Sequence, residues 1–237
     1  GLLIGARKGA PLAVGYAEGE AYLGSDAFAL APFTNRVAYL EEGDVAVVRD
    51  AQVSIFDSEG RPANRQIKIT AASAALVDKA GHSHFMAKEI HEQPEVVGHT
   101  LSRYLDAAGP GVLLPDEANK FLAEAPRLTI SACGTAFYAG LVGKYWFEQL
   151  AKLPVEADIA SELRYRDPIY PKGGVALYIS QSGETADTLA AMRDARKSGQ
   201  KIASIVNVPE SSIARESDIV LRTYAGPEIG VASTKAF

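Results

Sequence analysis

Hydroxyl groups, a side-chain amide and a glycine occur together in one short stretch: Ser180, Gln181, Ser182, Gly183 and Thr185. The glycine has no Cβ, so the backbone can approach a ligand closely there. A helix that begins directly after such a stretch presents free backbone N–H groups and the positive end of its dipole to an anion. The combination predicts a phosphate-binding loop made of hydroxyls and backbone N–H groups. An ordinary helix N-cap is the alternative interpretation.

Two further loops carry groups suited to a sugar phosphate. One contains Cys133, Gly134 and Thr135 and follows an apolar run. Because the carboxyl ends of parallel strands meet at one edge of a sheet, this loop is expected beside the Ser180–Thr185 stretch, one loop for phosphate and one for sugar hydroxyls. The other loop contains Ser233 and Thr234, which resemble the N-cap of a helix. Since the chain ends at Phe237, that helix would have no second turn, so we expect the C-terminus to be a cut.

Two residues could be nucleophiles, but the pattern favours structural roles for both. Cys133 would need a base in reach, such as His91 or His99 brought near in space, and a small buried side chain is the favoured interpretation. Lys235 could supply a Schiff-base amine, but an exposed structural lysine is favoured. The alternating charges of residues 162–167 fit either a solvated helix face or an interface contact.

Residues 128–237 show an alternation of predicted strands and helices that could position these loops. Five short apolar runs are expected to be strands, at 128–132, 155–159, 175–179, 202–206 and 219–221. Helices are expected between them, at 137–150, 161–166, 184–198 and 211–215. Near-continuous apolar strands that alternate with helices indicate an α/β fold with a five-stranded parallel, doubly wound sheet, buried on both faces.

The N-terminal part of the chain has a different pattern of predicted secondary structure. Residues 1–56 contain short β-type runs, which predict a mostly antiparallel β block with hairpin turns at Glu42–Asp44 and Arg49–Gln52. Ser25 and Asp26 are expected to cap a short helix. Residues 57–83 are interpreted as a polar linker with one strand at 65–69.

A helix is expected next, over residues 84–93. Pro94 should end it near Gln93 or kink it, and a second helix would follow through residues 96–105. Glycine and proline at 109–111 should stop that second helix.

Composition excludes several classes of function. The chain has 237 residues, a net charge of −5 and 47% hydrophobic residues, as expected of a globular protein without a basic surface for nucleic acid. No apolar run reaches the roughly 18 residues of a membrane helix. One cysteine excludes an internal disulfide and fits a reducing cytoplasm, and the four histidines have no metal-binding spacing. The first residue is Gly1 and not Met, so we expect a trimmed N-terminus.

Longer sequence motifs occur along the whole chain. They are Ser25–Asp26, Leu40–Asp44, Lys88–Pro94, Ala132–Thr135, Glu156–Arg166, Ser180–Leu189, Asn207–Pro209, Arg215–Asp218 and Glu228–Phe237. In this order and at this spacing they resemble the isomerising glutamine–fructose-6-phosphate aminotransferases. The resemblance covers essentially the whole chain.

The resemblance implies a domain organisation and a set of site residues. Residues 1–70 would be the C-terminal part of a glutaminase domain of the N-terminal-nucleophile type, 71–95 an interdomain connector, and 96–237 a truncated first sugar isomerase (SIS) subdomain of flavodoxin-like fold. The residues implied to hold the phosphate of fructose 6-phosphate are Ser180, Gln181, Ser182 and Thr185. The residues implied at the sugar are Thr135 and Val231, with Cys133, Gly134, Gly183 and Ser233 as secondary candidates. Ala136 stands where the family often has Ser.

The implied reaction converts fructose 6-phosphate and glutamine into glucosamine 6-phosphate in a homodimer, without a metal or organic cofactor. In the family the glutaminase nucleophile is a processed N-terminal cysteine, and the isomerase base, ring-opening histidine and Schiff-base lysine lie in a second subdomain. Cys133 is internal, so we expect this chain to bind sugar phosphate without catalysing either step. The alternatives are a non-catalytic SIS sensor or regulator, and a sugar isomerase or deaminase that does not use glutamine; residues 1–56 count against both.

Overall fold

The computed structural model describes residues 1–70 and 78–237, which fall into two compact units, residues 1–81 and 82–237. Residues 71–77 of the expected connector lie outside the described residues. Each unit is built on its own sheets, and each is described by itself below.

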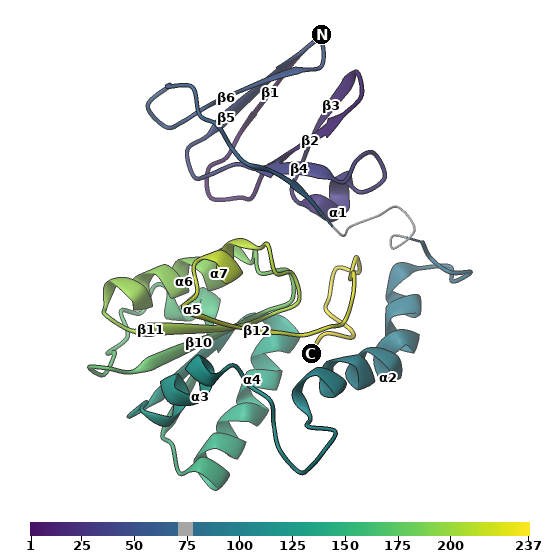
Figure 1. Ribbon diagram of the computed structural model, residues 1–237. Coiled ribbons are helices and arrows are strands. Elements are labelled where there is room, and N and C mark those ends of the chain that lie inside the picture. The colour runs from purple at the N-terminus through teal and green to yellow at the C-terminus, as the bar shows by residue number, and fades with distance from the viewer. Residues whose placement is uncertain (71–77) are drawn as a thin grey trace. The chain divides into compact units, whose positions relative to one another are not determined.

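The first unit consists of two antiparallel sheets, which confirms the predicted β block (Figure 1). One sheet has the order β1-β5-β6 and the other the order β3-β2-β4-β7. The elements are β1 Leu2–Ala6, β2 Ala13–Ala17, β3 Glu20–Gly24, α1 Ala27–Leu30, β4 Arg36–Tyr39, β5 Val45–Arg49, β6 Gln52–Phe56 and β7 Ile67–Ile69. Val14 from one sheet packs with Ala46 and Ile55 from the other, so the two sheets share a core.

Of the two predicted hairpin turns in this unit, one is confirmed and one is wrong. Asp50 and Ala51 have positive φ angles of 48° and 67° and close the β5–β6 hairpin. Glu42–Asp44 does not form a hairpin, because β4 and β5 belong to different sheets. The buried Asp44 carboxylate holds this crossing by accepting two hydrogen bonds from Arg65, at 2.7 and 2.8 Å. The predicted helix cap is confirmed, since Asp26 accepts from the backbone N–H of Ala29 at 2.9 Å.

The second unit contains the predicted five-stranded parallel sheet. Its strands are β8 Leu128–Ala132, β9 Val155–Ile159, β10 Val175–Ser180, β11 Lys201–Val206 and β12 Ile219–Arg222. They lie in the order β12-β11-β10-β8-β9, and all neighbouring pairs are parallel. This is a flavodoxin-like order, in which the chain changes direction across the sheet between β8 and β10. Open α/β sheets bind ligands at that point, beyond the carboxyl ends of the strands.

Helices cover both faces of this sheet (Figure 1). One face carries α5 Ala160–Leu163, α6 Ala186–Lys197 and α7 Ser212–Arg215, which pack around Tyr178 and Met192. The other carries α3 Asp116–Ala123 and α4 Gly134–Trp146, which pack around Ile130 and Leu177, and α4 continues into a π-helical turn at Phe147–Ala151. The sheet is therefore doubly wound, as predicted. The helix α3 was not predicted, although Pro115 followed by two acidic residues is a helix-start signal.

Pro94 does not end a helix. It lies inside α2 Phe85–Tyr104, so a separate second helix is not formed. The ribbon of α2 bends part-way along its length, which agrees with the other predicted outcome, a kink (Figure 1). The second half of α2 is packed against the end of β12 and the segment that follows it. The Tyr104 hydroxyl donates to the carbonyl oxygen of Arg222 at 2.8 Å, and the Thr100 hydroxyl accepts from the N–H of Tyr224 at 3.0 Å.

Candidate sugar-phosphate site

The Ser180–Thr185 loop lies where the strand order reverses, directly after β10. Ser180 is buried, and its Oγ accepts from the N–H of Gly183 at 3.1 Å. The same oxygen lies 3.0 Å from the Oγ1 of Thr185. Ser182 Oγ accepts from the N–H of Glu184 at 3.2 Å. The hydroxyls thus fold the loop on itself, and the side chains of Gln181 and Ser182 stay half-buried beside it.

Thr185 precedes the first turn of α6, but among the described residues its side chain caps no N–H of that helix. Its hydroxyl faces Ser180 instead. The geometry therefore does not favour the ordinary N-cap interpretation at Thr185. The first backbone N–H groups of a helix have no partner within the helix, so this end of α6 attracts negative charge.

Gly183 is required by the protein's own packing, a reason that the sequence analysis did not give. Its φ is +63°, a conformation that residues with a side chain rarely adopt. A Cβ built on Gly183 would lie 2.0 Å from Ser211 Oγ. The loop is therefore pressed against the residue that caps α7.

The Cys133–Thr135 loop follows β8, the strand next to β10. The helix α4 begins at Gly134, three residues before the predicted start at Phe137, so that boundary is wrong, and Gly134 and Thr135 lie in the first turn of α4. Cys133 is half-buried, and its sulfur accepts from the hydroxyl of the buried Thr188 in α6 at 3.8 Å. This position suits a packing side chain between the start of α4 and α6.

The loop from Glu228 to Lys235 lies against the Cys133–Thr135 loop. The Thr135 hydroxyl donates to the carbonyl oxygen of Ser233 at 3.3 Å. Residues 228–237, all of them described, contain no helix, and the three residues after Thr234 are too few to test the predicted helix start at Ser233 and Thr234. Their polar groups turn back to Glu228, whose carboxylate accepts from the Ser233 hydroxyl at 2.9 Å and from the backbone N–H groups of Thr234 and Lys235. Val231 is fully exposed at the tip of the loop.

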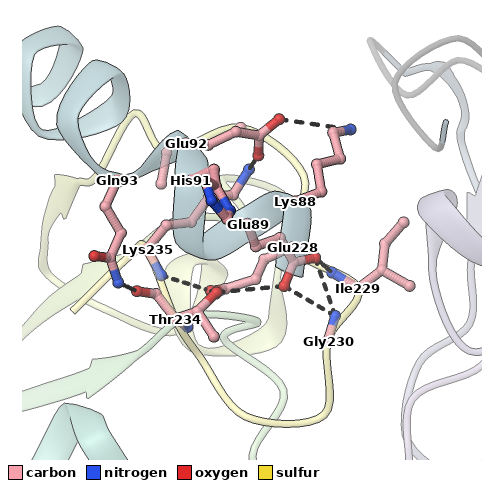
Figure 2. Close-up of polar contacts among 12 residues, drawn as sticks. Lys88, Glu89, His91, Glu92, Gln93, Glu228, Ile229, Gly230, Thr234 and Lys235 are labelled. Atoms are coloured by element: carbon pink, nitrogen blue, oxygen red, sulfur yellow. Dashed lines mark hydrogen bonds and ion pairs between the residues drawn. The ribbon is translucent and has the colours of Figure 1, made fainter. Parts of the chain in front are cut away.

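Lys235 is buried, so the prediction of an exposed lysine is wrong. Its Nζ donates to a carboxylate oxygen of Glu92 in α2 at 2.6 Å (Figure 2). Burial by itself raises the pKa of Glu92, but the hydrogen bond and charge of Lys235, with Lys88, hold that pKa below the ordinary value for glutamate. No residue on this face of α2 was among the predicted site residues. The available signal was the spacing of Glu89, Glu92 and Gln93, which places them on one side of a helix.

The remaining candidates do not assemble into a second site. His91 Nδ1 lies 2.7 Å from the carbonyl oxygen of Ala87, and its ring is 5.2 Å from that of His82. Within the described residues no three His, Cys, Asp or Glu side chains are grouped to hold a metal ion. None of the described helices is long and apolar enough to cross a membrane. In the charged run, Arg166 pairs with Glu156 and Asp158 of β9.

Comparison with known proteins agrees with this geometry. Residues 121–237 match the SIS domain family. This stretch of the chain is similar to a SIS domain. Over 100% of its length it is 60% identical to a glutamine–fructose-6-phosphate aminotransferase (isomerising) of Bradyrhizobium diazoefficiens, of which it covers 39%. The resemblance to that aminotransferase family, inferred from the motifs, is therefore confirmed, and the chain spans about two fifths of the length of this curated relative.

Solved structures show the same fold. The C-terminal domain of the glucosamine–fructose-6-phosphate aminotransferase of Francisella tularensis is 47% identical, with a TM-score of 0.61 over 68% of this chain and 45% of that one. A glucosamine-6-phosphate deaminase of Thermotoga maritima is 23% identical, with a TM-score of 0.50 over 61% of this chain and 41% of that one. The second likeness shows the fold alone, so the SIS fold does not by itself select one reaction.

Proposed function

We propose that residues 96–237 form the first SIS subdomain of an enzyme that converts fructose 6-phosphate and glutamine into glucosamine 6-phosphate and glutamate. The observation that carries the proposal is the Ser180–Thr185 loop at the switch point of the sheet, in a chain that is 60% identical to such an aminotransferase along its length. Residues 1–70 would be the C-terminal part of the glutaminase domain that releases ammonia from glutamine, and 71–95 the connector.

The proposal divides the site into a phosphate end and a sugar end. Ser180, Gln181, Ser182 and Thr185 bind the phosphate. Thr135 and Val231 contact the sugar, with Cys133, Gly134, Gly183 and Ser233 shaping the two ends. Hydroxyl and amide donors, together with the start of α6, stabilise the phosphate dianion by charge-assisted hydrogen bonds. These residues bind and orient the substrate, and the proposal assigns them no proton transfer and no cofactor.

We further propose a cytoplasmic homodimer. Support comes from α4 and the turn after it, which expose an apolar row at Tyr138, Val142, Tyr145, Trp146 and Leu150. Spacings of three and four residues place these side chains on one helix face. An exposed apolar face of this kind is typical of a protein interface. A non-catalytic SIS sensor is disfavoured, because the similarity to the aminotransferases extends through residues 1–81 as well.

Calorimetric titration of the chain with fructose 6-phosphate tests the proposal. Each hydroxyl that donates to a charged ligand contributes about 1.5–3 kcal/mol, so Ser182→Ala and Thr185→Ala should each weaken binding about tenfold or more. Ser198→Ala is the matched control, because Ser198 is an exposed hydroxyl at the opposite end of α6. Unchanged affinity in both loop variants, or no binding by the parent chain, would contradict the proposal.

A further inference from the structure

A buried carboxylate of α2 binds the backbone of the Glu228–Lys235 loop. Glu89 is only 2% exposed, and its Oε1 accepts from the N–H of Ile229 at 2.6 Å and of Gly230 at 3.0 Å (Figure 2). Its Oε2 lies 3.2 Å from the same N–H of Gly230 and 3.4 Å from the Thr234 hydroxyl. A buried carboxylate without such donors would be costly, so the loop and the helix stabilise each other's position.

The same face of α2 holds the other end of the loop. Glu92 pairs with Lys235, and the Gln93 side-chain amide donates to the carbonyl oxygen of Thr234 (Figure 2). Two carboxylates and one amide on α2 therefore bind both ends of the loop and leave its tip, Val231, projecting free of them. Glu228 closes the loop from inside through the N–H groups of Thr234 and Lys235.

Gly230 is matched to this contact. A Cβ on Gly230 would lie 2.6 Å from Glu89 Oε2 and 2.8 Å from Met86 Cγ. An alanine at this position would push the carboxylate away from the loop N–H groups that it accepts from. The contact therefore needs both the glycine at 230 and the buried carboxylate at 89, which are 141 residues apart in the sequence.

We propose that Glu89 is a positioning residue for the sugar end of the site. It fixes the Glu228–Lys235 loop so that the carbonyl oxygen of Ser233 meets the Thr135 hydroxyl, and it holds the loop next to its exposed tip, Val231, through the N–H groups of Ile229 and Gly230. The inference rests on the proposed function and refines it. The phosphate end is held by its own hydroxyls and by α7, whereas the sugar end is held from α2. Loss of Glu89 should therefore weaken recognition of the sugar and spare recognition of the phosphate.

Two probes separate these ends in an NMR titration of the full chain: fructose 6-phosphate and inorganic phosphate. We expect Glu89→Ala to weaken fructose 6-phosphate binding about tenfold while phosphate affinity changes by no more than about twofold. Glu89→Gln keeps one carbonyl oxygen for the loop N–H groups and should fall between Glu89→Ala and the parent. Glu95→Ala, an exposed glutamate on the same helix, is the matched control and should bind both probes like the parent.

Gly230→Ala breaks the same contact from the loop side. It should likewise weaken fructose 6-phosphate binding and spare phosphate binding. In the double variant Glu89→Ala/Gly230→Ala, the affinity for fructose 6-phosphate should be no lower than in the single variant that binds it less tightly. Unchanged fructose 6-phosphate binding in Glu89→Ala, or equal loss of both probes, overturns the positioning role and leaves the proposed function standing. A parent chain that binds neither probe overturns the proposed function and the positioning role together.

Discussion

The loops at the two ends of the candidate site are held in different ways. In the Ser180–Thr185 loop, Ser180 Oγ accepts from Gly183, three residues away, and Ser182 Oγ accepts from Glu184, two residues away. In the Glu228–Lys235 loop, the N–H of Ile229 reaches Glu89, 140 residues away. The hydroxyls of the first loop bond within the loop, and α7 adds backbone contacts, from the N–H of Ser212 to Glu184 at 2.7 Å and from the N–H of Ile213 to the carbonyl oxygen of Gly183 at 3.0 Å. The second loop is closed by Glu228 and depends in addition on buried carboxylates of α2.

The two kinds of support predict different responses to mutation. A loop held by hydroxyls two or three residues away keeps most of its shape if one hydroxyl is lost, because each neutral hydrogen bond contributes only about 0.5–1.5 kcal/mol. A loop held by buried charges loses more when one partner is removed, because the remaining charge stays buried and unpaired. The predictions below test this contrast, in order of decreasing effect on stability.

The largest effect is expected at Gly183, where the first loop does depend on a distant contact. Gly183→Ala places a side chain in the left-handed region and within 2.0 Å of Ser211 Oγ. Backbone strain and steric overlap together should lower the free energy of unfolding by about 3 kcal/mol or more. Urea unfolding of the full chain measures this loss.

Gly134→Ala is the matched control for this substitution. Gly134 has a similar φ of +60°, but no heavy atom of the described residues lies within 4 Å of its built Cβ. Only the backbone strain remains, so the loss should be about 1 kcal/mol. Equal losses at the two glycines would show that contact with Ser211 does not restrain the first loop.

The sequence was sufficient for the parts of the fold that depend on local pattern. Runs such as Val175–Ile179 are apolar without alternation, which is the mark of a strand buried on both faces, and they predicted the parallel sheet. The hydroxyls of Ser180, Ser182 and Thr185 predicted a polar loop at the end of that strand. Their hydrogen bonds span only a few residues, so the information lies in the stretch itself.

The sequence was insufficient where a partner lies far along the chain. From the sequence alone, Lys235 is predicted to be an ordinary surface lysine. In the structure it is paired with Glu92 of α2. Glu42–Asp44 was predicted to be a hairpin turn, but it connects two different sheets, and Arg65 binds the Asp44 carboxylate there. Pro94 predicts a helix end or a kink, and the helix continues past it to Tyr104, whose hydroxyl contacts Arg222 at the end of β12. At Lys235 and Asp44 tertiary contacts overrode a local preference.

An intermediate effect is expected at the ion pair that holds the second loop. Lys235→Met keeps the apolar stem but leaves Glu92 with Lys88, at 3.6 Å, in a partly buried position. We expect a loss of about 2 kcal/mol in the free energy of unfolding near neutral pH. The control Lys197→Met removes an exposed partner of Asp194 and should change stability by less than about 0.5 kcal/mol.

The same pair predicts a dependence on pH. The pKa of Glu92 is lowered in the folded chain, so its contribution is complete above the unfolded pKa of about 4.3 and is lost as the pH falls through the lower, folded pKa. The stability difference between the parent and Lys235→Met should therefore shrink in acid. Urea unfolding near neutral pH and at about pH 3 measures it, and a difference that grows on acidification would contradict the assignment.

The smallest effect is expected at Ser182. Its Oγ accepts one hydrogen bond in a half-buried loop, so Ser182→Ala should lower the free energy of unfolding by about 0.5–1 kcal/mol even though it weakens the proposed phosphate contact much more. Within the described residues no hydrogen bond or ion pair links Ser182 to the Glu228–Lys235 loop. The losses from Ser182→Ala and Lys235→Met should therefore add in the double variant to within about 0.5 kcal/mol. A larger departure from additivity would mean that the two loops form one cooperative unit, and that the contrast between a loop held from within and a loop held by α2 fails.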